Sequence, residues 1–164
     1  MDLMINIREI EKAEIFHLDN FLYDAIFIPE GQKKPDNEII QIPELFCYIK
    51  DFGKDSDLCL VAESQGDLIG AVWIRIYTEF KKGFGYVDSK TPELSMSVVE
   101  KYRKQGIGTK LLIKMIERLI QCGYVQVSLS VDLENYALKL YQKFGFVIVQ
   151  SDTKSAIMIK QLKK

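Results

Sequence analysis

The sequence predicts an α/β fold with a mixed, mostly antiparallel central sheet and helices on both faces. Segments with the two-residue repeat of strands alternate along the chain with segments that have the repeat of helices. Strands precede helices in the second half, as in crossover units, whereas the turn Ser64-Gln65-Gly66-Asp67 joins two strands as a hairpin in the middle. The chain has 164 residues, so we expect a single domain over 1–164.

The first half is expected to contain one short strand, two helices and the hairpin. Apolar residues spaced three and four apart predict a helix over 11–27. A weaker helix is expected over 42–52, because Gly53 suits its C-terminal end. The expected strands cover residues 4–8, 58–63 and 68–77.

The second half is expected to alternate strands and helices. Its strongest helix begins at Ile107, carries one apolar stripe and ends at Gly123. A further helix is predicted over 134–144, where Gly145 stops it. The expected strands cover residues 93–99, 125–131, 146–149 and 156–162.

The composition argues against several classes of protein. The formal net charge is -1, whereas a nucleic-acid-binding domain normally has a basic excess. Three cysteines without a CxxC pair and a single histidine argue against a metal site. The sequence has neither a signal-peptide pattern at its start nor an apolar stretch of membrane-spanning length. We therefore expect a cytoplasmic protein with no nucleic-acid partner, no membrane partner and no metal.

The most informative segment lies between a strand end and the long helix, and reads Arg103-Lys104-Gln105-Gly106-Ile107-Gly108-Thr109. The first turn of a helix has backbone amides without intrahelical partners, and the helix dipole favours an anion there. Glycines allow a phosphate to approach the backbone closely. An ordinary strand–helix turn would use the same glycines, and neither the GxxxxGK nor the GxGxxG nucleotide-binding pattern is present.

A second segment changes the interpretation of the first. Arg103-x-x-Gly106-x-Gly108 resembles the coenzyme A signature of the GNAT family of N-acetyltransferases. About 30 residues later, Asn135-x-Ala137-x-x-Leu140-Tyr141-x-x-x-Gly145-Phe146 resembles the second signature of that family. Both occur in the right order and at the right separation, and the order of the predicted elements also agrees. Many members have glycine where Lys104 stands.

The resemblance implies the acyl-CoA N-acyltransferase fold and acetyl-CoA as co-substrate, without a metal. Backbone amides from Arg103 through Thr109 would hold the pyrophosphate. In this family two strands splay apart, and the pantetheine arm pairs with a free strand edge, here Met96 to Val98. The Val98 amide would lie near the thioester carbonyl, and Asn135 would contact the cofactor arm. A homodimer is possible, as for many members.

Two residues are candidates for proton transfer when an amine attacks the thioester directly in a ternary complex. The resemblance implies that Tyr141 lies near the sulfur of the cofactor. Its phenol carries a proton at neutral pH, so it would protonate the departing thiolate. Glu93 opens the predicted strand ahead of the cofactor edge and would accept the amine proton, directly or through water. The alternatives are a packing tyrosine and a solvated glutamate at a strand end.

The acceptor is less well defined. A small-molecule primary amine is the first expectation; a protein or peptide amine, or a non-catalytic acyl-CoA sensor, is the alternative. The acidic residues Asp24, Glu30 and Glu44 would attract a cationic amine. Four further side chains would either line an acceptor pocket or pack the sheet, namely Trp73, Arg75, Tyr77 and Tyr86.

Overall fold

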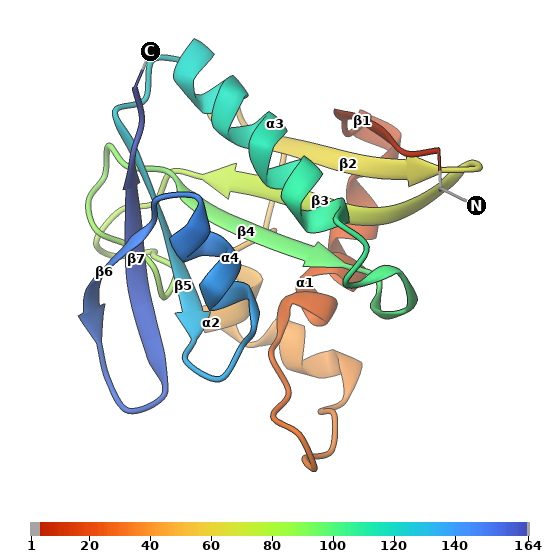
Figure 1. Ribbon diagram of the computed structural model, residues 1–164, viewed down its shortest axis with the longest axis horizontal. Helices are drawn as coiled ribbons and strands as arrows, with labels where there is room; N and C mark the ends of the chain where they lie inside the picture. Colours follow the sequence, from red (N-terminus) through yellow and green to blue (C-terminus); the bar gives the residue numbers. More distant parts are fainter. Residues whose placement is uncertain (1–3, 164) are drawn as a thin grey trace.

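The computed structural model describes residues 4–163, which form one sheet with helices on both faces (Figure 1). The strands are β1 (Asn6–Glu9), β2 (Leu58–Ser64), β3 (Asp67–Arg75), β4 (Glu93–Val98), β5 (Gln126–Asp132), β6 (Val147–Ser151) and β7 (Ser155–Gln161). The α-helices are α1 (Leu18–Ala25), α2 (Pro43–Phe46), α3 (Ile107–Gln121) and α4 (Ala137–Lys143). Short 3-10 helices are η1 (Lys12–His17), η2 (Asn37–Gln41) and η3 (Glu100–Tyr102).

The seven strands form a mixed sheet in the order β1-β2-β3-β4-β5-β7-β6. All neighbouring strands are antiparallel except β4 and β5, which are parallel. The predicted fold class is therefore confirmed. None of the helices between residues 4 and 163 is long and apolar enough to span a membrane.

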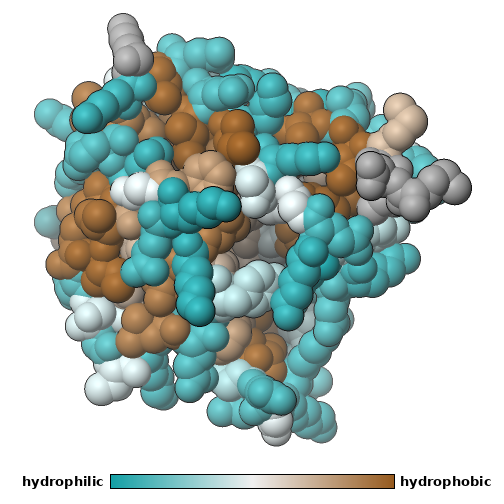
Figure 2. Space-filling model, in the orientation of Figure 1, coloured by the Kyte–Doolittle hydropathy of each residue, from teal (hydrophilic) through white to brown (hydrophobic). Residues whose placement is uncertain are grey.

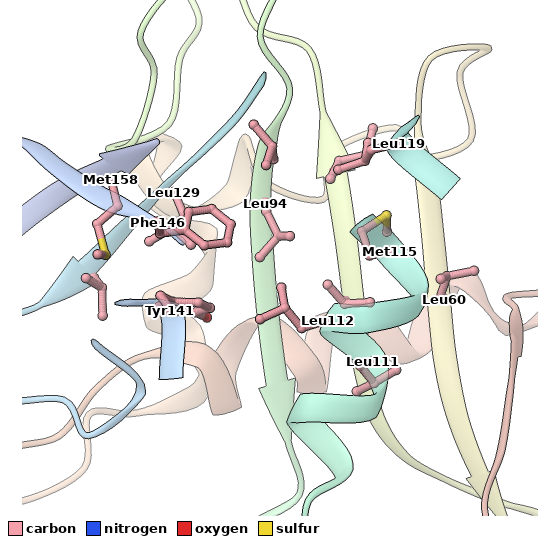
Figure 3. Close-up of a cluster of buried hydrophobic side chains, with 14 of the residues drawn as sticks. Leu60, Leu94, Leu111, Leu112, Met115, Leu119, Leu129, Tyr141, Phe146 and Met158 are labelled. Carbon is pink, nitrogen blue, oxygen red and sulfur yellow. The ribbon is translucent and has the colours of Figure 1, made fainter. Parts of the chain in front are cut away.

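The two faces of the sheet have separate hydrophobic cores. On one face, α3 and α4 pack against the strands, and α3 buries Leu111, Leu112, Met115 and Leu119 completely (Figure 3). On the other face, α1 and the segment after α2 pack around Trp73, which is 1% exposed. Because β4 lies between both cores, its side chains alternate between them: Leu94 faces α3, and Ser97 donates a hydrogen bond to the Phe21 carbonyl of α1 (2.7 Å).

The N-terminal helices are shorter than predicted. The expected helix over 11–27 consists of η1 followed by α1, and it ends at Ala25. Ile26 is already extended, and Ile28 precedes Pro29, a position that disfavours the helical conformation. The expected helix over 42–52 is only the single turn of α2 followed by irregular turns. Two backbone carbonyls of this segment, those of Cys47 (3.1 Å) and Lys50 (2.6 Å), accept hydrogen bonds from Arg75 Nη1 and not from helix amides.

The same guanidinium forms a buried ion pair that fixes this segment. Arg75 Nε and Nη2 donate to the two carboxylate oxygens of Asp57 at 3.0 and 3.1 Å, and the side chains are 7% and 3% exposed. Asp57→Asn would leave an uncompensated buried charge, so we expect the free energy of unfolding to fall by about 3–5 kcal/mol. Urea denaturation of the variant measures this loss.

An exposed ion pair provides the control for that experiment. Lys114 and Glu117 on α3 are 3.6 Å apart, and their side chains are 57% and 54% exposed. Glu117→Gln should leave the urea midpoint close to that of the parent, because water screens such pairs. Equal small losses in both variants would contradict the role given to the buried pair.

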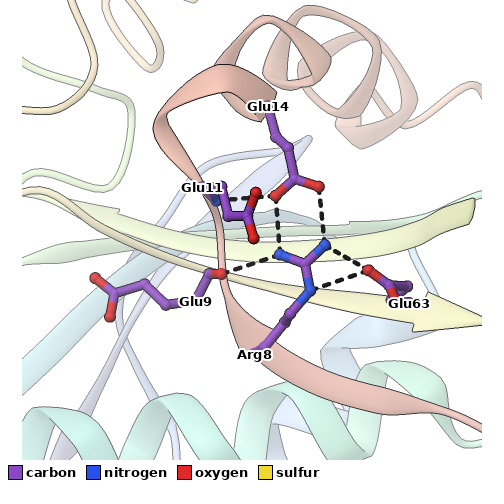
Figure 4. A network of polar contacts seen from close by, with 5 residues as sticks. All are labelled: Arg8, Glu9, Glu11, Glu14 and Glu63. Atoms are coloured by element: carbon purple, nitrogen blue, oxygen red, sulfur yellow. Dashed lines mark hydrogen bonds and ion pairs between the residues drawn. The ribbon is translucent and has the colours of Figure 1, made fainter. Parts of the chain in front are cut away.

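A second polar network fixes the path of the chain from β1 into η1 (Figure 4). The Arg8 guanidinium donates to both carboxylate oxygens of Glu14 at 2.8 Å and also to Glu63 of β2. Glu14 in turn accepts the Glu11 amide (2.9 Å), and its hydrogen bonds with Arg8 lower its pKa to about 2. The network therefore anchors the start of η1, and so of α1, to the edge of the sheet.

Candidate active site

The strands β4 and β5 separate almost as soon as they begin. Within residues 4–163 a single register pair joins them, Glu93 with Ser128, and the Ser128 amide donates to the Pro92 carbonyl (3.0 Å). Beyond this pair a cleft of about 1100 Å³ is lined by both strands, by the turn before α3 and by the segment after α1. The space-filling view shows this face of the molecule hollowed near its centre (Figure 2).

The edge of β4 that faces the cleft has backbone groups free to bind a ligand. The Pro92 carbonyl points toward β5, whereas the Val99 amide donates to the Ile69 carbonyl of β3 (2.9 Å). Backbone groups alternate between the two sides of a strand, so the amides of Met96 and Val98 point the same way as Pro92. Both residues line the cleft, as expected for a ligand that pairs with this edge.

The turn before α3 presents a run of backbone amides to the same cleft. The amides of residues 104–109 have no hydrogen-bond acceptor within residues 4–163, and no side chain caps the helix. Gly106 has φ 84° and Lys104 has φ 62°, both in the left-handed region, which favours glycine. The free amides and the dipole of a 15-residue helix suit an anion at this position.

Arg103 has a different role from the one expected. Its amide donates to the Glu100 carbonyl (3.1 Å), so it is not available to a ligand. Its side chain donates to the carbonyls of Val98 (2.8 Å) and Asp24 (3.1 Å). The side chain of Arg103 therefore links the end of β4 to the end of α1. The backbone amides that are free to bind an anion begin at Lys104.

The structure brings almost all of the predicted site residues to the cleft. The exception is Gln105, whose side chain donates to the Lys101 carbonyl (3.3 Å). The predicted residues that line the cleft are Glu93, Met96, Val98, Arg103, Lys104, Gly106, Ile107, Gly108, Thr109, Asn135 and Tyr141. Asn135 also accepts the Ala137 amide (2.9 Å), which orders the start of α4. Within residues 4–163, no group of three or more His, Cys, Asp or Glu side chains is placed to hold a metal ion.

Tyr141 lies on α4, where it belongs to the hydrophobic core and also lines the cleft. The side chain is 6% exposed, and its ring packs edge to face on Phe146 with centroids 5.6 Å apart (Figure 3). Burial raises the pKa of Tyr141, so the phenol keeps its proton at neutral pH and remains a potential donor.

Glu93 is buried, not solvated as the alternative interpretation of the sequence held. It is 2% exposed, and its Oε2 accepts hydrogen bonds from the Tyr48 hydroxyl (2.5 Å) and the Gly85 amide (3.1 Å). Its Oε1 has no partner within residues 4–163. Burial raises the pKa of Glu93 to about 7, against the two hydrogen bonds, which lower it. Such a carboxyl exchanges a proton readily near neutral pH.

The wall of the cleft on the side of α1 contains residues that no motif indicated. The end of α1 and the segment after it, together residues 22–32, line this wall, as do Leu45, Tyr48 and Phe84. Asp24 and Glu30 also lie there, as expected, whereas Glu44 does not. Tyr48 gave no signal in the sequence because it is one apolar position among several in a predicted helix.

The four side chains considered for an acceptor pocket do not line the cleft. Trp73 is buried and donates to the Tyr48 carbonyl (3.1 Å), and Arg75 is paired with Asp57. Tyr77 is buried, and Tyr86 packs beneath the Lys82 ammonium group. The packing alternative is therefore the correct one for Trp73, Arg75 and Tyr77.

Comparison with known proteins shows the family of the chain. The chain matches the model of the Acetyltransferase (GNAT) family over residues 18–146. It is 27% identical over 144 residues to N-alpha-acetyltransferase 30 of Homo sapiens, a match that covers 85% of this chain and 38% of the human protein. It is 25% identical over 145 residues to N-alpha-acetyltransferase MAK3 of Arabidopsis thaliana, covering 85% of this chain and 73% of the plant protein.

Solved structures share the fold. The PaiA N-acetyltransferase of Thermoplasma acidophilum, crystallised in complex with coenzyme A, superimposes with a TM-score of 0.69 at 20% identity. The superposition covers 97% of this chain and 99% of that one. The chain spans less than two fifths of the human relative, so the family model, which covers most of this sequence, carries the assignment. With its splayed strands and its turn of free amides, the chain belongs to the GNAT acetyltransferase family.

Proposed function

We propose that this protein transfers the acetyl group of acetyl-CoA to a primary amine by direct attack in a ternary complex, and that the acceptor is the α-amine of a peptide or protein. The observation that carries the proposal is the cleft between β4 and β5. It combines a free strand edge with a run of unpaired amides, which are the two features needed to hold an extended arm and a pyrophosphate.

The residues present fit acetyl-CoA. The amides of Met96 and Val98 would pair with the pantetheine arm, and those of residues 104–109 would hold the pyrophosphate. Gly108 lines the cleft without a side chain, so its backbone can come close to the cofactor arm. When bound, acetyl-CoA supplies an acetyl group activated as a thioester.

Two side chains would manage the protons of the transfer. The Glu93 carboxylate would accept a proton from the acceptor amine, directly or through water, because an amine attacks only when its nitrogen lone pair is free. The Tyr141 hydroxyl would donate a proton to the departing sulfur. The Val98 amide would donate a hydrogen bond to the carbonyl oxygen as negative charge develops on it.

The choice of acceptor reverses the order that the sequence alone favoured. Both relatives described above are named as N-alpha-acetyltransferases, which supports an N-terminal amine over a small molecule. The cleft of about 1100 Å³ is also lined by Phe84, Lys154 and Ser155, besides the candidate catalytic residues. A peptide would bind among these residues, and Asp24 and Glu30 would attract its positively charged terminus.

A panel of acceptors tests the proposal. Peptides with free α-amines, the same peptides with blocked α-amines and an internal lysine, and small primary amines would be incubated with acetyl-CoA. Release of free thiol and mass spectrometry would locate the acetyl group. Acetylation confined to free α-amines is the expected result. Turnover only with small amines would overturn the peptide acceptor, and binding of acetyl-CoA without any turnover would favour the sensor.

Tyr141→Phe tests the proton donor. We expect kcat to fall by about tenfold, a modest loss because a thiol with a pKa near 8.5 already leaves readily as its anion. The urea midpoint should change little, because phenylalanine keeps the ring and its packing on Phe146. Full turnover at unchanged stability would remove Tyr141 from the mechanism.

A further inference from the structure

Tyr48 links two parts of the site that belong to different elements. It follows α2 and is 7% exposed, and its backbone carbonyl is fixed by the Trp73 indole (3.1 Å). Its hydroxyl donates to Glu93 Oε2 (2.5 Å) and accepts the amide of Phe84 (2.7 Å). The phenolic oxygen of Tyr48 is therefore hydrogen-bonded both to the carboxylate of Glu93, the first residue of β4, and to the Phe84 loop (residues 83–85), which precedes β4.

The loop packs tightly against the hydrogen bond between Tyr48 and Glu93. The Gly85 amide donates to the same carboxylate oxygen (3.1 Å). A Cβ on Gly83 would lie 2.5 Å from both Glu93 Oε1 and the Tyr48 hydroxyl, so only glycine fits there. The Phe84 ring between the two glycines is 57% exposed and lines the cleft. The position of this ring on the acceptor side thus depends on the Tyr48 hydroxyl.

Few other titratable groups face Glu93. Tyr77, which follows β3, packs edge to face on Tyr48 with ring centroids 5.9 Å apart, and its buried hydroxyl has no partner within residues 4–163. Cys47 lies beside them, and burial, together with the neighbouring charge of Glu93, raises its pKa to about 11. From β5, Ser128 faces Glu93 across the sheet. From β3, Arg75 is the register partner of Glu93, and its guanidinium is paired with Asp57.

We propose that Tyr48 is a positioning residue for this site, which holds the Glu93 carboxylate in its ionised form and fixes the Phe84 loop against the acceptor. The proposal rests on the proposed function, because it assigns Glu93 a role in acetyl transfer. Removal of the hydroxyl takes one hydrogen bond from the carboxylate and leaves the Phe84 amide without its acceptor. The first loss affects the proposed base, and the second affects the loop beside the amine substrate. Neither changes the backbone amides before α3.

Tyr48→Phe and Tyr77→Phe form a matched pair for the test. Each removes one buried phenolic oxygen from the same cluster, but only Tyr48 hydrogen-bonds to Glu93. In Tyr48→Phe we expect the acid limb of the kcat profile to move up by about one pH unit, since a hydrogen bond to a charged group stabilises it by roughly that amount. The KM of the acceptor should rise at every pH, and acetyl-CoA binding should not change. Tyr77→Phe should leave all three as in the parent.

Two further readouts separate this proposal from the proposed function. Carbon-13 NMR titration of the Glu93 carboxyl reports its pKa without any acceptor, and Phe84→Ala removes the ring but leaves the amide on Tyr48. In Tyr48→Phe we expect the pKa of the Glu93 carboxyl to rise. In Phe84→Ala we expect the KM of the amine substrate to rise and the acid limb of the kcat profile to stay where it is. An unchanged carboxyl titration in a folded Tyr48→Phe protein would overturn the positioning role. If the titration shifts but no amine is acetylated, the proposed function fails while the hydrogen bond to Glu93 stands.

Discussion

Glu93→Gln is expected to lower kcat/KM for the acceptor by about 100-fold, the typical contribution of a general base. The amide cannot take a proton, although its oxygen still accepts hydrogen bonds from Tyr48 and Gly85, so the loop should keep its position. The loss therefore reports proton transfer and not a change of shape. Steady-state rates of thiol release measure it.

The pH dependence makes this test sharper. The parent carboxyl has a pKa near 7, so it is a base above that pH and is protonated, and inactive as a base, below it. In the parent, Glu93 takes the proton that an α-amine, with a pKa of about 7.7–8.0, must lose before it attacks. In Glu93→Gln, water must take this proton. Below both pKa values, log kcat/KM should rise with a slope of about one per pH unit in both proteins, but the rise should level off near pH 7 in the parent and only near the pKa of the amine in the variant. A rise that levels off at the same pH in both proteins would remove Glu93 from the mechanism.

Gly106→Asp is expected to weaken acetyl-CoA binding by more than about 100-fold. A Cβ at this position meets nothing within 4 Å, so the side chain would extend into the space beside the free amides. Its carboxylate would occupy the anion site and repel the pyrophosphate. Calorimetric titration of acetyl-CoA into the folded variant measures the loss.

Gly66→Asp provides a matched control. Gly66 has φ 86°, close to the 84° of Gly106, and a Cβ there also meets nothing within 4 Å. It lies in the turn between β2 and β3, away from the residues that line the cleft. The strain of a left-handed aspartate is therefore similar, and acetyl-CoA should bind this variant as it binds the parent. Equal weakening in both variants would mean that strain, and not the anion site, explains the effect.

Most of the sheet could be predicted because its strands and helices carry regular apolar repeats. The helix from Ile107 and the strand from Glu93 begin where the sequence indicated. The predicted strand over 68–77 ends early, at Arg75, and the predicted helix over 42–52 becomes a single turn. The strand ends where its partner β4 begins, at the pair of Arg75 with Glu93. The segment after α2 is bound by Arg75, whose contacts with Asp57, Cys47 and Lys50 come from far along the chain and do not appear in local patterns.

The cofactor side of the site could be predicted better than the acceptor side. Backbone amides at a glycine turn depend on local conformation, so the motif placed Gly106 and Gly108 on the cleft. The side chain of Arg103, by contrast, turns to the carbonyls of Val98 and Asp24, which only the tertiary fold brings near it. Tyr48 reaches Glu93 across 45 positions of sequence and belongs to no motif. The homodimer and the single domain over 1–164 stay predictions.

The central claim is that acetyl-CoA binds between β4 and β5 on the backbone of the α3 turn. Amide-resolved NMR titration of the protein with acetyl-CoA tests it directly. The account predicts the largest shifts at the amides of Met96, Val98 and residues 104–109, and small shifts at the β2–β3 turn. Shifts concentrated elsewhere, or no saturable binding, would contradict both the site and the acetyltransferase activity proposed for it.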